Sequence, residues 1–163
     1  MLNDEIRVYQ MLDELNIPYK KYQHPPYSST KEANKFNKKI KGVHCKNLFL
    51  RSGNGNNHYL LIIESTKEVN FKNLAKYLKE NRINFASVKV LMKYLGIESR
   101  AITPFRLMND RKREVKVLID TDLRYFENIN FQPNINTATV TISFMDFERY
   151  LDWCGNKVKY INV

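Results

Sequence analysis

The sequence predicts a mixed α+β fold in which helices cover a largely antiparallel sheet. Amphipathic stretches with a helical period alternate with short apolar runs, as helices and strands do within one domain. Two of these runs flank the turn sequence GNGNN at 53–57, which predicts a β-hairpin, and TATVTIS at 137–143 alternates as a strand does. At 163 residues the chain suits one domain over residues 1–163, because two halves would each be short of core.

The first forty residues predict a helix, a strand and a second helix. Residues 4–15 place apolar side chains near one face of a helix, which NIP at 16–18 ends. YKKYQH at 19–24 reads as a short strand that stops at a double proline, since proline is excluded from helix interiors and central strands. In SSTKEANKF at 28–36, a Ser or Thr N-cap followed by Glu32 predicts a capping box and a helix of about two turns.

The middle of the chain predicts a buried hairpin followed by two helices. Residues 45–50 and 58–64 are the hairpin strands, and their apolar runs indicate that both are well buried. NFKNLAKYLKEN at 70–81 is an amphipathic helix capped by Asn70. FASVKVLMKYLGI at 85–97 then predicts a capped helix that ends at Gly96.

The last third predicts three strands and a closing helix. A loop over 98–113 precedes a strand at 114–120, and a turn or short helix leads to a strand at about 128–131. The alternating strand at 137–143 follows, and FMDFERYLDWCG forms an amphipathic helix that stops at Gly155.

The charge of the chain favours a polyanionic partner. A net charge of +10 and a sequence pI near 9.6 suit RNA, DNA or an acidic membrane face, although a general enrichment in Lys and Asn would raise the pI without any such role. The chain has no apolar run long enough to cross a bilayer, and its acidic, amphipathic start differs from a signal peptide. Two cysteines are too few for a disulfide framework and fit a reducing compartment, so we expect a cytoplasmic protein.

The segment HCKNLFLRS at 44–52 concentrates polar chemistry in front of an apolar run. His44 and Cys45 are neighbours on a strand and point to opposite faces, so we expect no metal site, and we expect Cys45 to be a small buried apolar residue. No phosphate-binding or dinucleotide motif is present, and we expect no cofactor. Lys46 shares a face with two leucines and could anchor a phosphate; it could equally be a strand-end lysine whose stem covers the core.

Two proline-containing loops suggest the rest of a pocket. AITPFRLMND at 101–110 and FQPNINTAT at 131–139 combine rigid turns with short polar side chains, which suits a small substrate read by hydrogen bonds and shape. Purely structural turns would look similar, so both interpretations stay open at the level of the residues.

Four motifs together resemble a known family. HPPYSSTKEA at 24–33, KNLFL at 46–50, ITPFRLMND at 102–110 and FQPNINTATV at 131–140 resemble, in order and spacing, the YbaK family of aminoacyl-tRNA editing domains. The resemblance runs from about residue 4 to the end of the chain. It is strongest to the free-standing prolyl-tRNA deacylases of the ProX or PrdX type, which hydrolyse alanine wrongly attached to proline tRNA, while close relatives clear cysteine.

The resemblance implies a pocket between the sheet and the two loops, with aminoacylated tRNA(Pro) as the partner. It implies that Lys46 contacts the terminal adenosine and that the backbone of residues 101–103 positions the ester carbonyl and the water. The implied catalytic residues are Lys46, Ala101, Ile102 and Thr103. The implied substrate-binding residues are Ser29, Thr30, Asn47, Arg100, Gln132, Pro133 and Asn136.

Two positions depart from the family pattern. Arg100 replaces the glycine that begins the family's Gly-x-x-x-Pro loop, which makes a positive φ there costly. Gln132 replaces a histidine and cannot titrate near pH 7, so general-base catalysis at that position is excluded. Assistance by the tRNA 2′-hydroxyl, which the family implies, survives both changes. The alternatives are a Cys-tRNA(Pro) deacylase, a catalytically weakened module associated with prolyl-tRNA synthetase in trans or in one chain, and a protein with general RNA affinity.

Overall fold

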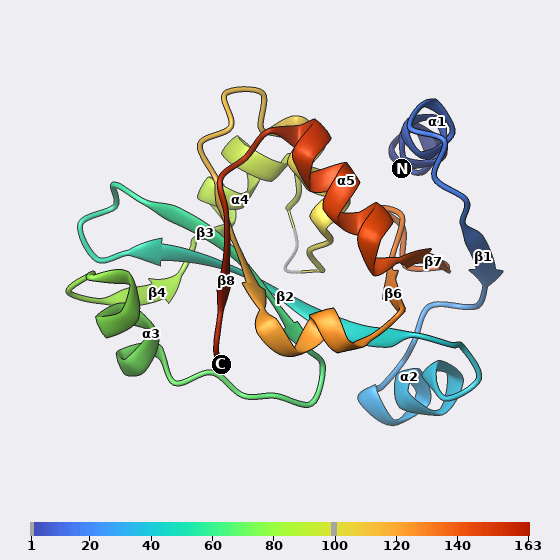
Figure 1. The fold of residues 1–163 in the computed structure, drawn as a ribbon, viewed down its shortest axis with the longest axis horizontal. Helices are drawn as coiled ribbons and strands as arrows, with labels where there is room; N and C mark the ends of the chain where they lie inside the picture. Colours follow the sequence, from blue (N-terminus) through green and yellow to red (C-terminus); the bar gives the residue numbers. More distant parts are fainter. Residues whose placement is uncertain (1, 99–100) are drawn as a thin grey trace.

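A computed structural model describes residues 2–98 and 101–163, and within them an eight-stranded mixed sheet carries helices on both faces (Figure 1). The strand order is β1-β7-β6-β2-β3-β5-β8, with β4 paired to β2 off this path. The strands are β1 (Lys20–Gln23), β2 (Val43–Ser52), β3 (His58–Glu64), β4 (Ile83–Phe85), β5 (Lys116–Asp120), β6 (Asn128–Phe131), β7 (Ala138–Ser143) and β8 (Val158–Ile161). The α-helices are α1 (Leu2–Glu14), α2 (Thr30–Asn37), α3 (Phe71–Leu78), α4 (Val88–Leu95) and α5 (Phe144–Cys154), and the short 3-10 helices are η1 (Pro104–Asn109) and η2 (Thr121–Tyr125).

The predicted α+β class is confirmed, and most predicted elements are present. The caps work as the sequence indicates: the Asn70 side chain accepts from Asn73 N, and Gly96 and Gly155 end α4 and α5 with positive φ. Two strands were not predicted, β4 and β8, because each is a short edge strand that pairs along one side only. No described helix is both long and apolar enough to traverse a lipid bilayer.

The start of α2 differs from the predicted capping box. Ser29 is the N-cap, and its hydroxyl accepts from Glu32 N at 3.1 Å. The Glu32 carboxylate returns to the N–H and hydroxyl of Ser28, one residue before the cap, instead of to the cap itself. The helix start is therefore pinned by both serines, and the segment that leads into it is held against its first turn.

Strand β2 joins the two halves of the sheet, and its edge is open in the middle. Along one side, residues 45–51 pair antiparallel with β3. On the other side, β6 pairs parallel only at Val43 and His44, and β4 pairs antiparallel only from Leu50 to Ser52. Residues 45–49 therefore have a strand neighbour on one side only, and the sheet carries a gap there.

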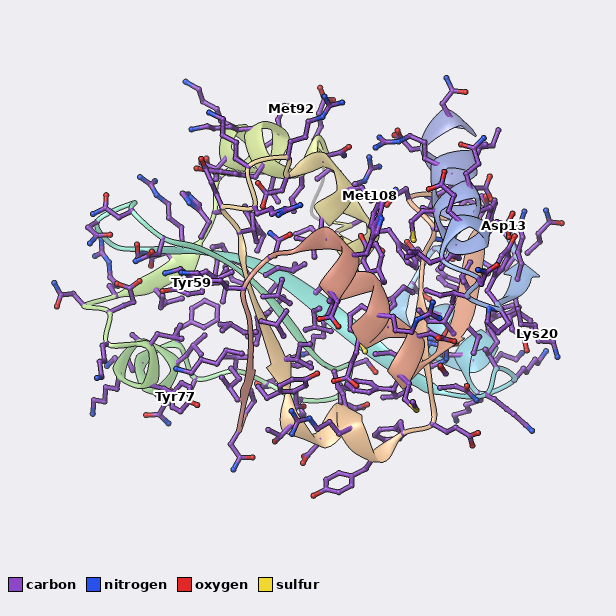
Figure 2. The ribbon with its side chains drawn as sticks, turned by 45° about the horizontal axis from the view of Figure 1, so that its top comes forward. Asp13, Lys20, Tyr59, Tyr77, Met92 and Met108 are labelled. Carbon is purple, nitrogen blue, oxygen red and sulfur yellow. The ribbon has the colours of Figure 1, made fainter. Side chains whose placement is uncertain are left out.

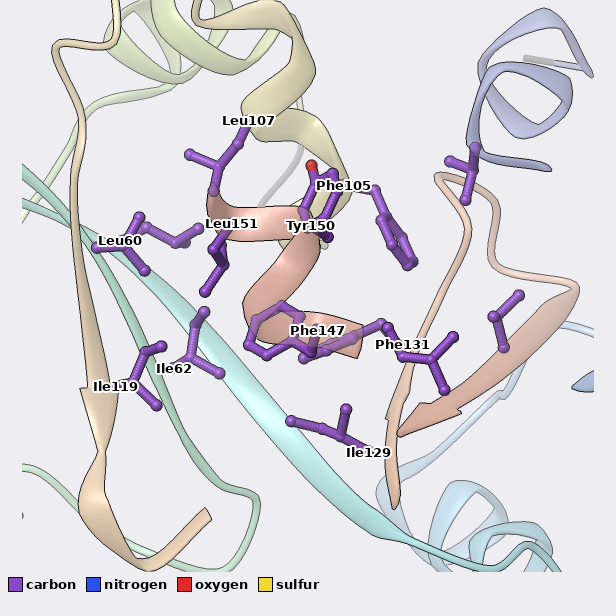
Figure 3. Packing of buried hydrophobic residues seen from close by; sticks show 14 of the residues in the cluster. Leu60, Ile62, Phe105, Leu107, Ile119, Ile129, Phe131, Phe147, Tyr150 and Leu151 are labelled. Atoms are coloured by element: carbon purple, nitrogen blue, oxygen red, sulfur yellow. The ribbon is translucent and has the colours of Figure 1, made fainter. Parts of the chain in front are cut away.

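Alternation along β2 and β3 divides the apolar side chains between two cores. Phe49, Leu60 and Ile62 face the larger core, where α5 supplies Phe147, Tyr150 and Leu151 (Figure 3). Leu50, Leu61 and Ile63 face the smaller core beneath α3, and Leu48 packs against it. Cys45 packs with the larger core and Leu48 with the smaller one, so the predicted alternation of 45, 47 and 49 against 46, 48 and 50 is confirmed.

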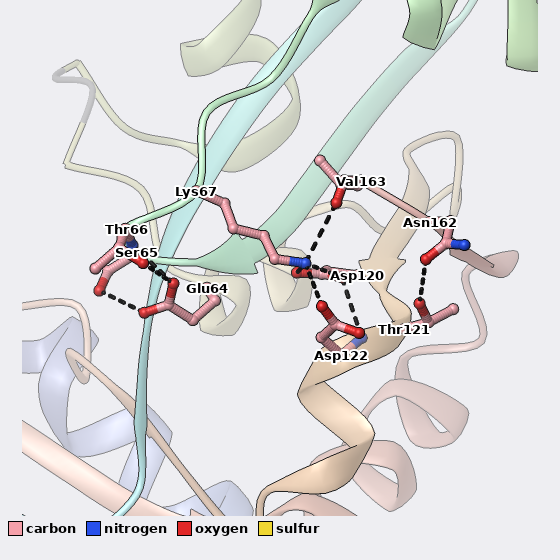
Figure 4. A network of polar contacts seen from close by, with 9 residues as sticks. All are labelled: Glu64, Ser65, Thr66, Lys67, Asp120, Thr121, Asp122, Asn162 and Val163. Atoms are coloured by element: carbon pink, nitrogen blue, oxygen red, sulfur yellow. Dashed lines mark hydrogen bonds and ion pairs between the residues drawn. The ribbon is translucent and has the colours of Figure 1, made fainter.

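A polar cluster ties the end of β5 to the loop after β3 and to the C-terminus (Figure 4). The Lys67 ammonium lies 2.8 Å from Asp120 Oδ2 and 2.6 Å from Asp122 Oδ2, and it donates to the Val163 carbonyl at 3.3 Å. Burial alone would lower the pKa of Lys67, but the contacts with both carboxylates outweigh burial and raise it above its ordinary value. Lys67 therefore stays charged and compensates the fully buried Asp120.

Candidate active site

The gap beside β2 opens into the larger of two adjoining cavities, with a volume of about 430 Å³. Its walls come from the middle of β2, from α2 and the loop before it, from β6 and from the segment after residue 100. Among its described lining residues, Lys46 is the only lysine or arginine, and none is a carboxylate. The cavity therefore offers one fixed positive charge among amide, hydroxyl and apolar groups, which suits a neutral or anionic ligand.

Lys46 and Asn47 both reach this cavity although they point to opposite faces of β2. They lie opposite Ile63 and Ile62 of β3, and consecutive residues of a strand alternate between faces. Both line the cavity because it wraps around the unpaired edge of β2. The Lys46 ammonium forms no ion pair or hydrogen bond among the described residues and is free to meet a ligand.

Two side chains from distant parts of the chain hold the 101–104 segment. Asn47 Nδ2 donates to the Ile102 carbonyl at 3.0 Å, and the buried Tyr150 hydroxyl donates to the Pro104 carbonyl at 2.8 Å. Between them Thr103 caps η1, its hydroxyl accepting from Phe105 N at 3.4 Å. Burial raises the pKa of Tyr150 well above its ordinary value, so this donor keeps its proton. The segment is thus positioned before any ligand arrives.

A second cavity of about 250 Å³ adjoins the first and shares Ala101 and Gln132 with it. Thr103 and Asn136 line only this smaller space. Arg106 lines it too; it is 8% exposed, and its Nη1 pairs with Asp4 at 3.1 Å. Gln132 therefore stands where the two cavities meet, between the strand edge and the proline loop.

The predicted site residues divide into three groups. Lys46, Asn47, Ala101, Ile102 and Gln132 surround the larger cavity, and Thr103 and Asn136 the smaller one. Ser29 caps α2 and Pro133 is buried, and neither is among the described lining residues of either cavity; Thr30 is the first residue of α2. Arg100 lies outside the described residues.

Several lining residues were not predicted from the sequence. Asn130 donates from Nδ2 to the Lys41 carbonyl at 2.9 Å, and the same Nδ2 lies 3.3 Å from His44 Nε2. That His44 nitrogen is also 3.2 Å from the Asn37 carbonyl. His44 and Cys45, to which the sequence assigned no role, therefore both line the cavity, and His44 ties its floor to α2.

The buried His24 fixes the loop between β1 and α2 against β7. His24 Nδ1 lies 3.0 Å from the Pro25 carbonyl, which can only accept, so Nδ1 carries a proton. His24 Nε2 lies 2.9 Å from the Thr139 hydroxyl, and the ring stacks on Tyr27 with centroids 4.5 Å apart. Tyr27 and Thr139 both line the larger cavity, so His24 shapes its wall without entering it.

Neither Cys45 nor His44 is prepared for acid–base or nucleophilic chemistry. Burial raises the pKa of the Cys45 thiol far above its ordinary value, so the thiolate is scarce near pH 7. Burial lowers the pKa of His44 below 6.5, which keeps the imidazole neutral. Among the residues that the structure describes, no three or more potential metal ligands come together.

The lowered pKa of His44 predicts a loss of stability on the acid side. The unfolded chain binds a proton near the ordinary value of 6.5 while the folded chain resists it, so the free energy of unfolding falls as the pH drops below 6.5. Urea unfolding at pH 7.5 and pH 5.5 measures this fall. It is expected to be smaller in His44→Gln than in the parent, and an equal fall in both would contradict the prediction.

Comparison with known proteins places most of the chain in one family. Residues 24–150 match the family model of the aminoacyl-tRNA editing domain. The prolyl-tRNA editing protein ProX of Acetoanaerobium sticklandii is 34% identical over 156 residues, which cover 96% of this chain and 95% of that protein. Prolyl-tRNA synthetase associated domain-containing protein 1 of Mus musculus is 27% identical over 168 residues, covering 99% of each.

A solved structure shares the fold. It is described as a candidate trans-editing enzyme for prolyl-tRNA synthetase, and it superposes with a TM-score of 0.70 and 14% identity over 98% of this chain and 97% of that one. At that identity the likeness shows the fold alone, whereas the family model and the 34% relative carry the assignment. The chain therefore belongs to the aminoacyl-tRNA editing domain family and is an aminoacyl-tRNA deacylase.

Proposed function

We propose that this chain is a trans-editing hydrolase that removes alanine from mischarged tRNA(Pro). The observation that carries the proposal is the cavity at the open edge of β2, where Lys46, Asn47 and the 101–102 backbone converge. The name and near-complete coverage of the 34% identical ProX protein support tRNA(Pro) as the substrate class. The cavity volume of about 430 Å³ is in the range of small-ligand sites.

The proposed reaction needs orientation more than a strong base. Water attacks the carbonyl carbon of the aminoacyl ester, the bond to the ribose 3′-oxygen breaks, and that oxygen leaves as a hydroxyl. The neighbouring 2′-hydroxyl of the tRNA assists the water. Lys46 anchors the terminal nucleotide, and the backbone of residues 101–103 supports the carbonyl as negative charge develops on it.

Gln132 and Asn136 border the aminoacyl group in this proposal. Gln132 lies at the junction of the two cavities and Asn136 lines the smaller one. The amino acid esterified to the terminal adenosine would therefore pass between these two side chains. Gln132 can donate and accept hydrogen bonds but cannot take up a proton near pH 7. Gln132 therefore contributes no ionisation to the pH profile of deacylation. The Gln132→Asn variant is expected to have a pH profile of the same shape as that of the parent.

A panel of charged tRNAs tests the substrate. Deacylation of Ala-, Cys- and Pro-tRNA(Pro) is measured with purified protein at equal substrate concentrations, with spontaneous hydrolysis subtracted. We expect Ala-tRNA(Pro) to be cleaved fastest and Pro-tRNA(Pro) to survive. Faster cleavage of Cys-tRNA(Pro) would favour the cysteine-clearing alternative. Binding without cleavage of any would identify a tRNA-binding module instead.

Asn47 is proposed as a positioning residue for the 101–103 backbone. Removing its donor in Asn47→Ala releases the Ile102 carbonyl, and we expect kcat for Ala-tRNA(Pro) to fall about 10- to 100-fold with a smaller change in KM. Asn47→Asp keeps the size but cannot donate, so it should be as impaired as the alanine variant. Parent-like kcat in Asn47→Asp would show that the hydrogen bond does not position the backbone.

Prolyl-tRNA synthetase is the proposed protein partner, in trans or within a longer chain, and the cytoplasm is the proposed place of action. The name of the mouse relative, a prolyl-tRNA synthetase associated domain-containing protein, supports the first point. Sedimentation of the two purified proteins, with and without tRNA(Pro), tests it. No change in sedimentation under either condition would leave shared tRNA as the only link between them.

A further inference from the structure

The positive charge of the chain is concentrated in one segment. Residues 15–63 hold eight lysines and one arginine against a single acid, Glu32. The rest of the chain holds 18 basic and 16 acidic residues and is nearly neutral. A general enrichment in lysine would spread the charge evenly, so the concentration calls for a local cause.

Within this segment, five lysines gather on α2 and the turn that follows it. All five are exposed. We call this set the α2 lysine surface: Lys31, Lys35, Lys38, Lys39 and Lys41.

Helix α2 forms one wall of the cavity and carries three of these lysines away from it. Positions 31, 35 and 38 recur at intervals of four and three, so they share one side of the helix. Ala33 and Asn37 line the cavity, and Phe36 packs against His24 at a centroid distance of 4.8 Å. The opposite sides of one short helix thus carry the cavity wall and a row of ammonium groups.

The charges of the α2 lysine surface are not neutralised within the protein. The ion pairs among the described residues involve Lys21, Lys67, Arg106 and Arg149, and none involves a lysine of this surface. Glu32 is turned toward Ser28 by two hydrogen bonds. Five exposed ammonium groups that form no ion pair among the described residues create a strong local attraction for a polyanion.

We infer that the α2 lysine surface docks the sugar-phosphate backbone of the tRNA acceptor stem while the 3′-terminal nucleotide enters the cavity. The inference rests on the proposed function, because it takes aminoacyl-tRNA as the ligand of the cavity. A tRNA strand whose 3′ end lies beside Lys46 has to leave the cavity past one of its walls. Helix α2 is a wall that carries positive charge without ion-pair partners among the described residues. Phosphate contacts of this kind set affinity and register without reading sequence.

Helix α3 provides a matched control for α2. Both helices have eight residues and an N-capping side chain, and Lys72 and Lys76 occupy the same helical positions as Lys31 and Lys35. All four lysines are exposed. Helix α3 lies at the far end of the molecule from α2 (Figure 1), with Tyr77 of α3 and Lys20 near α2 marking the two ends in Figure 2. No α3 residue lines either cavity.

The binding test compares two double variants with the parent. The dissociation constant of uncharged tRNA(Pro) is measured by fluorescence anisotropy at KCl concentrations from about 0.05 to about 0.3 M, which bracket physiological ionic strength. Lys31→Gln/Lys35→Gln is expected to weaken binding about 10-fold at 0.1 M KCl and to reduce the salt slope by about one to two. Lys72→Gln/Lys76→Gln should match the parent. Equal behaviour of the two variants would overturn the inference.

A small substrate separates docking from catalysis. 3′-O-Alanyl adenosine occupies the cavity but is too short to reach beyond α2, so the α2 variant should hydrolyse it at the parent rate while losing kcat/KM on Ala-tRNA(Pro). An equal loss on both substrates would mean that α2 shapes the cavity and does not dock the stem. If the parent hydrolyses neither substrate, the proposed function fails, and the binding comparison still decides the docking surface.

Discussion

Replacing Lys46 by alanine is expected to lower kcat/KM for Ala-tRNA(Pro) at least about 100-fold. The larger cavity has no other lysine or arginine among its described lining residues, so this change removes its only fixed positive charge. In the proposed mechanism the terminal nucleotide then loses its anchor, and the ester is no longer held against the 101–103 backbone. Single-turnover deacylation with enzyme in excess measures the loss of rate separately from product release.

Two comparisons make the Lys46 result interpretable. The free energy of unfolding of Lys46→Ala should stay within about 0.5 kcal/mol of the parent, since the ammonium has no partner among the described residues. Lys46→Arg keeps the charge and should recover part of the rate. Lys89→Ala removes an exposed lysine of α4, away from both cavities, and should change nothing. A parent-like rate in Lys46→Ala would overturn the assignment.

Replacing Asp110 by alanine is expected to lower the free energy of unfolding by roughly 3 kcal/mol. Its buried carboxylate accepts from Glu114 N at 3.2 Å, from Val115 N at 2.8 Å and from Asn156 Nδ2 at 2.8 Å. Truncation leaves the buried Val115 N–H and Asn156 amide without their shared acceptor, in places that water reaches poorly. Urea unfolding followed by circular dichroism measures the change.

The loss of Asp110 should also loosen the candidate active site, because η1 connects the two. Asp110 is the C-cap of η1, which begins at Pro104 after its N-cap Thr103, so a looser end of η1 weakens the hold on the 101–104 segment. Asp152→Ala, the loss of an exposed acid of α5, is the control and should leave stability unchanged within about 0.5 kcal/mol. Asp110→Ala with parent-like stability would mean that solvent replaces all three bonds.

The sequence was informative wherever the signal is local. Asn70, Gly96 and Gly155 mark helix ends because a cap depends on a side chain or backbone angle within one turn, and all three act as predicted. The hairpin of β2 and β3 was predictable because its turn joins the two strands directly. The parallel pairings of β3 with β5 and of β5 with β8 were not, since a strand's period indicates a strand but not its neighbour.

The same distinction applies to the site. The resemblance pointed to Lys46 and Asn47, and strand alternation placed them on opposite faces. It could not reveal that both reach one cavity, because this depends on where β6 and β4 leave β2. Asn130 went unnoticed because it lies outside the four motifs of the resemblance, and its place in the cavity wall depends on the pairing of β6 with β2 and β7.

The two anchors of the 101–104 segment have a consequence for the order of synthesis. Asn47 is made early, but Tyr150 lies on the last helix, so a nascent chain that has emerged only as far as β7 lacks the donor that holds the Pro104 carbonyl. The 101–104 segment gains its second anchor only after α5 has left the ribosome and packed against the sheet. Hydrolytic competence is therefore expected to appear only after residues 144–154 have been made and have folded onto the sheet.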